Sequence, residues 1–233
     1  MKNKPEYSLV FPVMNQADHI ERAIRLYHQA LTKNRHSFEL IAVVNGTKDK
    51  SYNICREVAK KLDNVSAYEL KRGGYGLGIL HGLKKSKGKY LCYLNSARIH
   101  PPDLIRIIRH FEIDPKIIVH GVRLKRESAK RGIGSLIYNV FCRSIFRVSN
   151  RDINGNPNMF SREIYDKLKL RSKNSMIDLE LLDRAKHLYI PIVEVPVFDY
   201  SRYGGRSTSN FFTLFRLLKE VFIYFFKTRI FTA

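Results

Sequence analysis

Cysteine is scarce in this sequence, which has only three in 233 residues: Cys55, Cys92 and Cys142. An odd number of widely spaced cysteines, each set in an apolar run, does not suit a disulfide framework or a cysteine metal site. We therefore expect three reduced thiols in the core. Reduced thiols in turn predict a cytoplasmic protein.

Acidic residues are half as frequent as basic ones. The 21 Asp and Glu against 42 Lys and Arg give a formal charge of +21, and the pI is near 10.0. A charge so far from zero predicts an anionic partner: a phosphate-rich ligand, a nucleic acid or an acidic membrane surface. Charge alone does not choose among the three.

Long apolar runs are also missing. No stretch of 18 uninterrupted apolar residues exists, so no ordinary membrane span is predicted, and the apolar stretch from Leu9 to Met14 is too short for a signal-peptide core. What the chain does have is an apolar fraction of 44% with 12% aromatics, which indicates a folded domain rather than a disordered chain.

Strand and helix signals alternate through the first half of the chain. Buried-type strands are expected at 7–13, 38–44, 65–70 and 90–94, with helical periodicity between them. This alternation predicts an α/β fold with right-handed crossovers and a mostly parallel sheet flanked by helices. Ligands of such sheets bind beyond the carboxyl ends of the strands, so the loops starting at Val13, Val44 and Leu94 should converge on one crevice.

The second half continues with mixed elements. A helix should open at Pro101 and Pro102, whose missing N–H groups suit a first turn. A strand is expected at 116–124, a helix at 135–148, a strand or turn at 158–168, a helix at 176–188 and a strand at 190–200. The final segment, 209–229, predicts an amphipathic helix with Phe211, Phe215, Leu218, Phe222 and Phe225 at helical spacing.

Seven segments, in order, resemble the family-2 glycosyltransferases of the GT-A (Rossmann-like) fold. The sequence is most similar to the dolichol-phosphate mannosyltransferase branch, which glycosylates polyprenyl phosphates. The segments are "SLVFPVMNQADHI", "ELIAVVNGTKDKS", "GGYGLGILHGLKKSKGKYLCYL", "SARIHPPDL", "NMFSREIYDKL", "IDLELLDRAKHLYIPIVEVPV" and "RYGGRS". The resemblance implies a transferase that is inverting, uses a nucleotide-sugar donor and acts on a polyprenyl-phosphate or other membrane-borne acceptor.

The sequence departs from the family at its acidic positions. The Asp-x-Asp that holds Mg²⁺ or Mn²⁺ in the family reads Asn95, Ser96 and Ala97 here, and the paired aspartates of the second loop read Val44 and Asn45. Hard cations need oxygen ligands, preferably anionic. No metal ligand is therefore assigned, and fixed cations such as Lys71, Arg72, Arg98 and Arg123 are expected to neutralise the donor diphosphate instead.

The resemblance also assigns site residues. Donor binding falls to Pro12, Val13, Asn15, Val44, Asn45, Gly46, Arg72, Gly76, Asn95, Ser96 and Arg98. The positions at the chemistry are Asn95, Ala97 and Asp178. The acceptor phosphate is expected to bind Arg123, Arg131, Arg202, Arg206 and Ser207.

Each assignment has a structural alternative. Asn95 and Ser96, like His100, could cap the helix that follows. Arg123 and Arg131 could be solvated charges of a basic loop. Asp152 and Asp178 could be ion-pair partners. The glycine-rich "GGYGLG" lacks the context of a dinucleotide-binding fingerprint.

The domain division that we expect is a GT-A-like domain at 1–208 and an amphipathic helix at 209–233. Aromatic residues edged by Arg and Lys favour attachment of that helix to an anionic membrane surface on the cytoplasmic inner face, although packing on the domain is the alternative. A scaffold that kept the fold after losing the metal acids is a second hypothesis. Nucleic-acid binding is a third, but no recognisable nucleic-acid motif is present.

Overall fold

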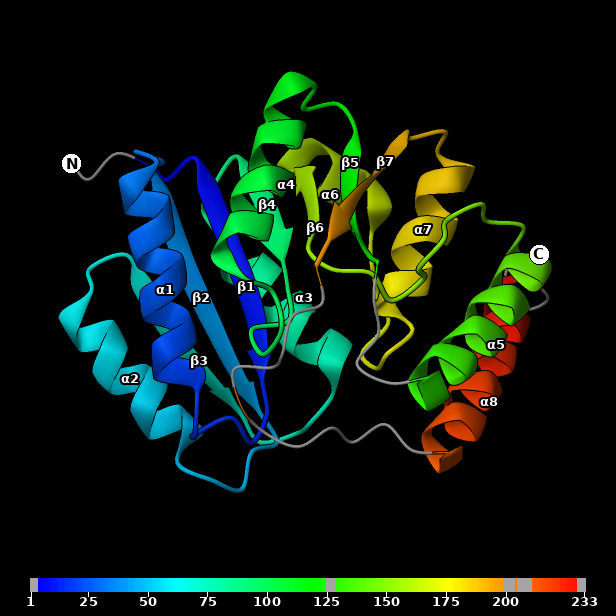
Figure 1. The fold of residues 1–233 in the computed structure, drawn as a ribbon, viewed down its shortest axis with the longest axis horizontal. Helices are drawn as coiled ribbons and strands as arrows, with labels where there is room; N and C mark the ends of the chain where they lie inside the picture. The colour runs from blue at the N-terminus through cyan, green and yellow to red at the C-terminus, as the bar shows by residue number, and fades with distance from the viewer. Residues whose placement is uncertain (1–3, 125–128, 199–203, 205–210, 230–233) are drawn as a thin grey trace.

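A computed structural model describes residues 4–124, 129–198, 204 and 211–229 of the chain (Figure 1). Its strands form one seven-stranded sheet in the order β3-β2-β1-β4-β6-β5-β7. The strands are β1 (Tyr7–Val13), β2 (Phe38–Asn45), β3 (Val65–Leu70), β4 (Tyr90–Tyr93), β5 (Ile118–Arg123), β6 (Asn158–Ser161) and β7 (Ile192–Val197). The helices are α1 (Ile20–Lys33), α2 (Ser51–Lys61), α3 (Tyr75–Lys85), α4 (Pro101–Ile113), α5 (Ala129–Phe146), α6 (Arg162–Leu168), α7 (Ile177–His187) and α8 (Phe211–Arg229).

The sheet is parallel except for β6, which pairs antiparallel with both β4 and β5. β1 lies between β2 and β4, with Val13 opposite Val44 and Val10 opposite Tyr93. The expected mostly parallel α/β sheet is therefore confirmed, and the carboxyl ends of β1, β2 and β4 lie side by side. That edge is where parallel sheets bind ligands.

Alternation along β1 explains how the sheet is covered on both faces. Leu9 and Phe11 belong to one hydrophobic cluster, which includes residues of α1, α2 and α4. Val10 belongs to a second cluster, which includes residues of α3, α6 and α7. Because successive side chains of a strand point to opposite faces, one buried strand contributes to both clusters.

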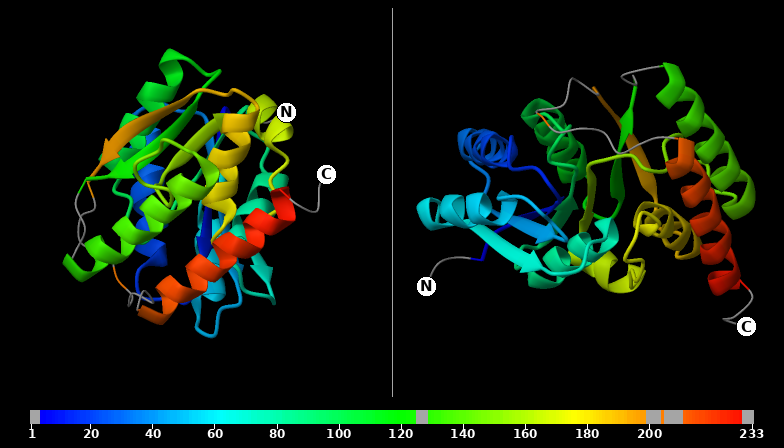
Figure 2. Two further views of the ribbon diagram at one scale, coloured as in Figure 1. Left: turned by 90° about the vertical axis from the view of Figure 1, so that its right-hand side faces the viewer. Right: turned by 90° about the horizontal axis from the view of Figure 1, so that it is seen from below.

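A third hydrophobic cluster joins α5, α7 and α8. Its buried members include Tyr138 and Cys142 of α5, Leu179 of α7 and Val221 of α8. Arg229 near the end of α8 also donates to the buried Asp183 carboxylate of α7, at 2.5 Å. α5 and α8 lie side by side at one end of the molecule, as Figures 1 and 2 show.

Several element boundaries differ from the sequence expectations. α5 begins at Ala129, six residues earlier than expected, because the helix extends into the basic stretch before it. α3 begins at Tyr75, inside the glycine-rich segment. The expected aromatic face of α8 is divided: Phe215 and Phe222 are exposed, whereas Leu218 and Phe225 pack against the third cluster.

The cysteines follow the expectation, because Cys55, Cys92 and Cys142 are free and buried. Burial is the main cause that raises the pKa of the Cys55 and Cys142 thiols to about 12. Among the described residues, no helix has the length and apolar character that a membrane span requires.

Close packing of α3 on β1 requires a glycine at position 82. A Cβ there would lie 2.2 Å from Cγ1 of Val10, whereas a Cβ at Gly134 in α5 would meet nothing within 4 Å. Gly82→Ala should therefore lower the free energy of unfolding by about 1–3 kcal/mol through overpacking. Gly134→Ala, the matched control, should raise it by about 0.5–1 kcal/mol because alanine favours helix. Urea denaturation measures both, and equal effects of the two substitutions would contradict this packing.

Candidate functional site

The loops that follow β1 and β2 are bound to each other by hydrogen bonds. The backbone N–H of Asn15 donates to Oγ1 of Thr47 at 2.7 Å, and that of Ala17 donates to Oδ2 of Asp49 at 3.0 Å. The Asn15 side chain returns a bond by accepting from the Lys48 N–H at 2.9 Å. Asn15 has a φ of 52°, in the left-handed region that asparagine tolerates better than most residues.

Asp49 holds this junction together. Its carboxylate accepts from the Ser51 N–H at 2.9 Å and from the Ser51 hydroxyl at 2.5 Å, in addition to Ala17. Burial opposes ionisation of Asp49, but these hydrogen bonds to the charged form outweigh burial, so the pKa of the carboxyl is lowered. Asp49 is thus an ionised anchor between the first two loops.

The loop after β4 joins the same junction. Oγ of Ser96 donates to Oε1 of Gln16 at 2.6 Å, and the Gln16 N–H donates to Oγ of Ser51 at 2.8 Å. The phenol of Tyr27 donates to the carbonyl of Ile99 at 2.7 Å. The three loops therefore converge, as the sequence predicts.

Hydrogen bonds within the protein engage the polar side chains of Asn95 and Ser96. Oδ1 of Asn95 accepts from the Ala97 N–H at 3.0 Å. Ser96 and Ala97 are buried, and Ala97 has no side-chain oxygen. Asn95 thus stabilises its own turn, while His100 stands at the N-cap of α4 without a side-chain capping bond. The alternative in which these side chains cap α4 is therefore wrong.

The oxygen set at this loop does not fit a divalent cation. Hard cations require several oxygen ligands, preferably anionic, and Asn95 and Ser96 offer neutral oxygens that are already engaged. Over residues 4–124, 129–198, 204 and 211–229, no group of three or more His, Cys, Asp or Glu side chains is arranged to hold a metal ion. No metal ligand can be named from this arrangement.

The second loop contacts the loop after β3. Val44 is buried in the first hydrophobic cluster, so its side chain belongs to the core. The amide of Asn45 donates to the carbonyl of Gly74 at 2.5 Å. Gly46 has a φ of 62°, and a Cβ there would lie 2.6 Å from Cα of Gly73. The glycines allow two backbones to cross closely at the edge of the sheet.

The N-terminus of α3 bonds to the protein's own backbone. The N–H of Gly76 donates to the carbonyl of Asn174 at 3.2 Å, and that of Leu77 to the carbonyl of Lys173 at 2.9 Å. The buried Glu180 carboxylate fixes the backbone just before these two carbonyls, because it accepts a hydrogen bond from the Ser172 N–H at 2.7 Å. These two N–H groups of α3, including that of the proposed donor residue Gly76, thus already have acceptors.

The remaining donor candidates lie around this junction. Pro12 and Val13 are buried at the end of β1, and the Pro12 ring packs against α3 at Gly78. Lys71 and Arg72 are exposed in the loop after β3, and Arg98 is half-buried in the loop after β4. The structure therefore gathers the predicted donor residues at one edge of the sheet.

Arg123 is engaged by an acid. Its Nε and Nη2 donate to the two carboxylate oxygens of Asp152 at 2.7 and 2.8 Å, and Nη2 also donates to the carbonyl of Asn154 at 3.0 Å. This forked pair confirms the alternative in which Asp152 is an ion-pair partner, and it contradicts a solvated Arg123. The side chain of Arg131, and residues Arg202, Arg206 and Ser207, lie outside what the structure describes.

Asp178 is a buried carboxyl in the first turn of α7. Its Oδ1 accepts from the phenol of Tyr93 at 2.9 Å. Burial is the main cause that raises the pKa of Asp178 to about 7, against the lowering effects of the Tyr93 bond and the Arg123 charge. Burial, followed by the charge of Asp178, also raises the pKa of Tyr75. Asp178 can therefore change its charge near neutral pH.

Sequence reasoning missed several of these positions. Asp49 had a local signal, because an aspartate two residues before a serine at a helix start commonly accepts backbone N–H groups. No local sequence signal marks Gln16, Tyr27 or Tyr93. Their bonds join residues 72 to 85 positions apart, which no local pattern records.

Comparison with known proteins identifies similar sequences and folds. Residues 8–169 match the family described as glycosyl transferase family 2. The undecaprenyl-phosphate 4-deoxy-4-formamido-L-arabinose transferase of Pseudomonas fluorescens (strain Pf0-1) is 26% identical over 220 residues, 92% of this chain and 63% of that protein. Glycosyltransferase AglD of Haloferax volcanii is 27% identical over 203 residues, 82% of this chain and 32% of that protein. The chain thus spans less than two thirds of either relative.

Solved structures show the same fold. A crystal structure of glucosyl-3-phosphoglycerate synthase from Mycobacterium tuberculosis, in complex with Mn²⁺, uridine-diphosphate-glucose and phosphoglyceric acid, superposes with a TM-score of 0.74. The match covers 96% of this chain and 79% of that one at 16% sequence identity. At that identity the likeness establishes the fold, which is the expected GT-A architecture.

The raised pKa of Asp178 predicts how stability depends on pH. The unfolded carboxyl ionises near pH 4, whereas the folded one ionises near 7. Its stabilising contribution is therefore fully present below pH 4 and is lost as the pH rises through 7. Asp178→Asn should be more stable than the parent at pH 8, by roughly 2–4 kcal/mol, and should lose that advantage near pH 4. Urea denaturation at both pH values tests this, and a difference independent of pH would contradict it.

Proposed function

Because the chain belongs to glycosyl transferase family 2, we propose that it transfers a sugar from a nucleotide-diphosphate donor to a polyprenyl phosphate or another membrane-borne acceptor. The observation that carries the proposal is the convergence of the loops after β1, β2 and β4 at the carboxyl edge of a parallel sheet. The name of the Pseudomonas relative, an undecaprenyl-phosphate transferase, supports the acceptor class.

Donor binding is proposed to depend on fixed cations rather than on a divalent ion. Asn95 and Ala97 occupy the two positions where the family resemblance leads us to expect aspartates. The Asn95 amide oxygen accepts a hydrogen bond from a backbone N–H. The exposed cations of the loop after β3, Lys71 and Arg72, and the half-buried Arg98 supply positive charge at the same edge. Preorganised cations stabilise the negative charge that develops on a leaving diphosphate.

The acceptor chemistry requires no strong base. A phosphate monoester already carries a nucleophilic oxygen at neutral pH. In the proposed step this oxygen forms a bond to the anomeric carbon, the bond from that carbon to the diphosphate oxygen breaks, and the nucleoside diphosphate leaves with the electron pair. One displacement from the opposite side inverts the anomeric centre.

The acceptor phosphate is proposed to bind near Arg123, with Arg131, Arg202, Arg206 and Ser207 as further candidates from the sequence resemblance. Arg123 is held in place by Asp152 and is 19% exposed at its side chain. The forked ion pair with Asp152 fixes the orientation of the Arg123 guanidinium. Asp178 is the candidate acid of the same region, because the Arg123 charge is among the causes that act on its pKa.

The proposed acceptor lies in a membrane, so we place the protein peripherally on the inner face. A net charge of +21 favours anionic lipid. A second candidate function is a scaffold that kept the fold without catalysis. The observation that favours it is the loop after β4, where Asn95 and Ser96 bind the protein itself.

Nucleotide binding separates these functions. Isothermal titration with uridine, guanosine and cytidine diphosphates, in Mn²⁺ and then in EDTA, should give one nucleotide whose affinity is unchanged by chelation. Arg72→Gln should weaken that binding by about tenfold, the scale of a charged hydrogen bond. Arg56→Gln, which removes an equal charge from α2, is the matched control. Binding of no nucleotide in either condition would favour the scaffold.

A restored carboxylate tests the metal independence directly. Asn95→Asp keeps an oxygen to accept the Ala97 N–H and adds negative charge, whereas a carboxylate at buried Ala97 would be desolvated. We expect Mn²⁺ to strengthen nucleotide binding in Asn95→Asp more than in the parent. An equal strong requirement for Mn²⁺ in both proteins would overturn the assignment of fixed cations.

A further inference from the structure

The outer sides of α5 and α8 expose a group of large apolar side chains, which we call the α5/α8 face. Each member is between 45% and 60% exposed, although most large apolar residues of the described chain are buried. The members on α5 follow helical spacing, and so do those on α8. They are Ile133, Leu136, Ile137, Val140, Phe215, Phe222, Ile223 and Phe226.

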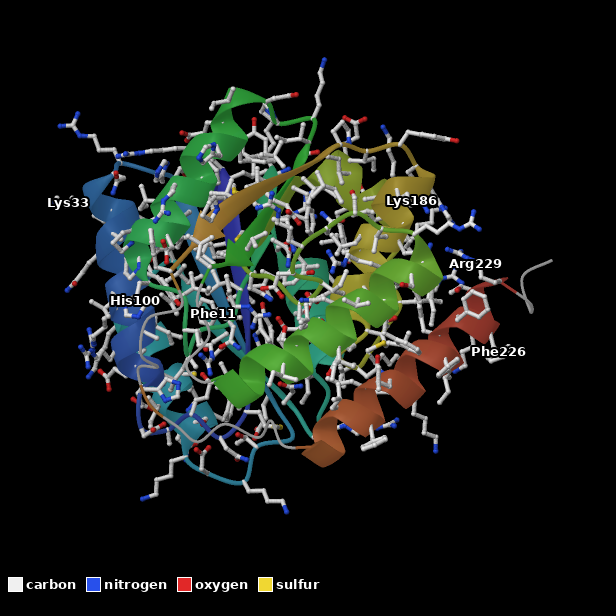
Figure 3. All side chains as sticks on the ribbon, turned by 45° about the vertical axis from the view of Figure 1, so that its right-hand side comes forward. Phe11, Lys33, His100, Lys186, Phe226 and Arg229 are labelled. Atoms are coloured by element: carbon white, nitrogen blue, oxygen red, sulfur yellow. The ribbon has the colours of Figure 1, made fainter. Side chains whose placement is uncertain are left out.

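The two halves of the α5/α8 face are continuous. The rings of Phe141 and Phe222 meet at the seam between the helices, with centroids 5.2 Å apart. On the inner side, Cys142 of α5 and Val221 of α8 are fully buried. The left view of Figure 2 shows both helices in front of the rest of the protein, and Figure 3 shows Phe226 at the outer edge. The exposed residues therefore belong to one outward surface.

Charges around the α5/α8 face are almost all positive. Arg216, Lys219 and Lys227 are exposed on α8. The sequence of α5 contains no acid, and Glu220 is the single acid of α8. Its side chain is only 22% exposed and accepts from the Asn174 amide at 3.0 Å. An apolar surface edged by cations complements a surface that offers hydrocarbon beneath anionic groups.

We propose that the α5/α8 face docks in the headgroup boundary of an anionic phospholipid bilayer. Its aromatic and aliphatic side chains enter the acyl boundary, and its lysines and arginines contact lipid phosphates. A second copy of the chain fits this face less well, because two copies would bring their cations together without acids to pair with them.

This inference deepens the proposed function, since a membrane-borne acceptor requires such docking. α5 packs against α7, whose first turn contains Asp178, because Tyr138 and Leu179 belong to the same hydrophobic cluster. Tyr138, on the inner side of α5, is buried, and Asp178 is among the causes that raise the pKa of its phenol. Docking through the outer side of α5 therefore brings the Asp178 region close to the lipid headgroups.

Tryptophan reporters test the placement residue by residue. The protein contains no tryptophan, so Leu136→Trp on α5 and Phe226→Trp on α8 each give an emission without background. With vesicles of phosphatidylcholine and phosphatidylglycerol, both emissions should shift to the blue, and brominated acyl chains should quench them. The matched control is Ile113→Trp, at an exposed position on α4, which should show neither effect. Equal responses of the three reporters, or none at Leu136 and Phe226, would overturn the proposal.

Charge variants test the choice of lipid. In vesicle sedimentation, Lys219→Gln with Lys227→Gln should weaken binding to the anionic vesicles by about 25-fold, from about fivefold per basic residue. Leu136→Glu should weaken it by at least about tenfold. Analytical ultracentrifugation without lipid tests whether a second copy of the chain covers the α5/α8 face instead. A dimer that Leu136→Glu dissociates would overturn membrane docking in favour of dimerisation. Matching circular dichroism spectra establish that each variant is folded.

Vesicle binding is measured without nucleotide or acceptor, so its outcome is independent of the proposed transfer. If the protein binds vesicles but no nucleotide, the proposed sugar transfer is rejected and the assignment of the α5/α8 face stands. If the intact protein binds a nucleotide but no vesicles, membrane docking of the α5/α8 face is rejected and the proposed sugar transfer stands.

Discussion

The hydrogen bonds between the loops after β1, β2 and β4 are the constraint on which the candidate site depends. A chain of hydrogen bonds links these loops, and it runs through Asp49, Ser51, Gln16 and Ser96. The parallel register of β1 with its neighbours brings the strand ends to one edge, but it does not fix the loops beyond them. Ionised Asp49 does so by accepting backbone N–H groups from both sides of the junction. A preorganised edge of this kind is what a polar ligand requires, because little ordering remains to be completed on binding.

The sequence predicts the sheet well because the buried strands are nearly continuous apolar runs between periodic helices. β1 and β3 begin and end where expected, and α4 begins at Pro101. The antiparallel direction of β6 could not be predicted, since four residues carry no signal for direction. α5 begins six residues before the start that the sequence predicts, because basic residues that favour helix resemble a polar loop in sequence.

The candidate site was predicted by position more successfully than by contact. The convergence of three loops follows from strand order, but Val44 is a core residue, Gly76 bonds to a distant carbonyl, and Arg123 is held by Asp152. Each outcome depends on a partner far away in the chain, 29 residues in the case of Arg123 and Asp152. Family resemblance transfers a place in the fold, whereas the partners of a charged side chain are specific to each chain.

The packing of α8 against α5 and α7 has a consequence during synthesis, because α8 is made after both of them. The inner side of α5 packs with Val221 and Tyr224, and α8 is fixed to α7 through Arg229 and Asp183. α8 follows α5 in the chain, so the part of the inner side of α5 that packs against α8 stays exposed until α8 has been made. Nascent chains with such uncovered surface are prone to aggregate or to engage chaperones. Translation that stalls after β7 and before α8 would leave an aggregation-prone intermediate in which every strand of the sheet has been made.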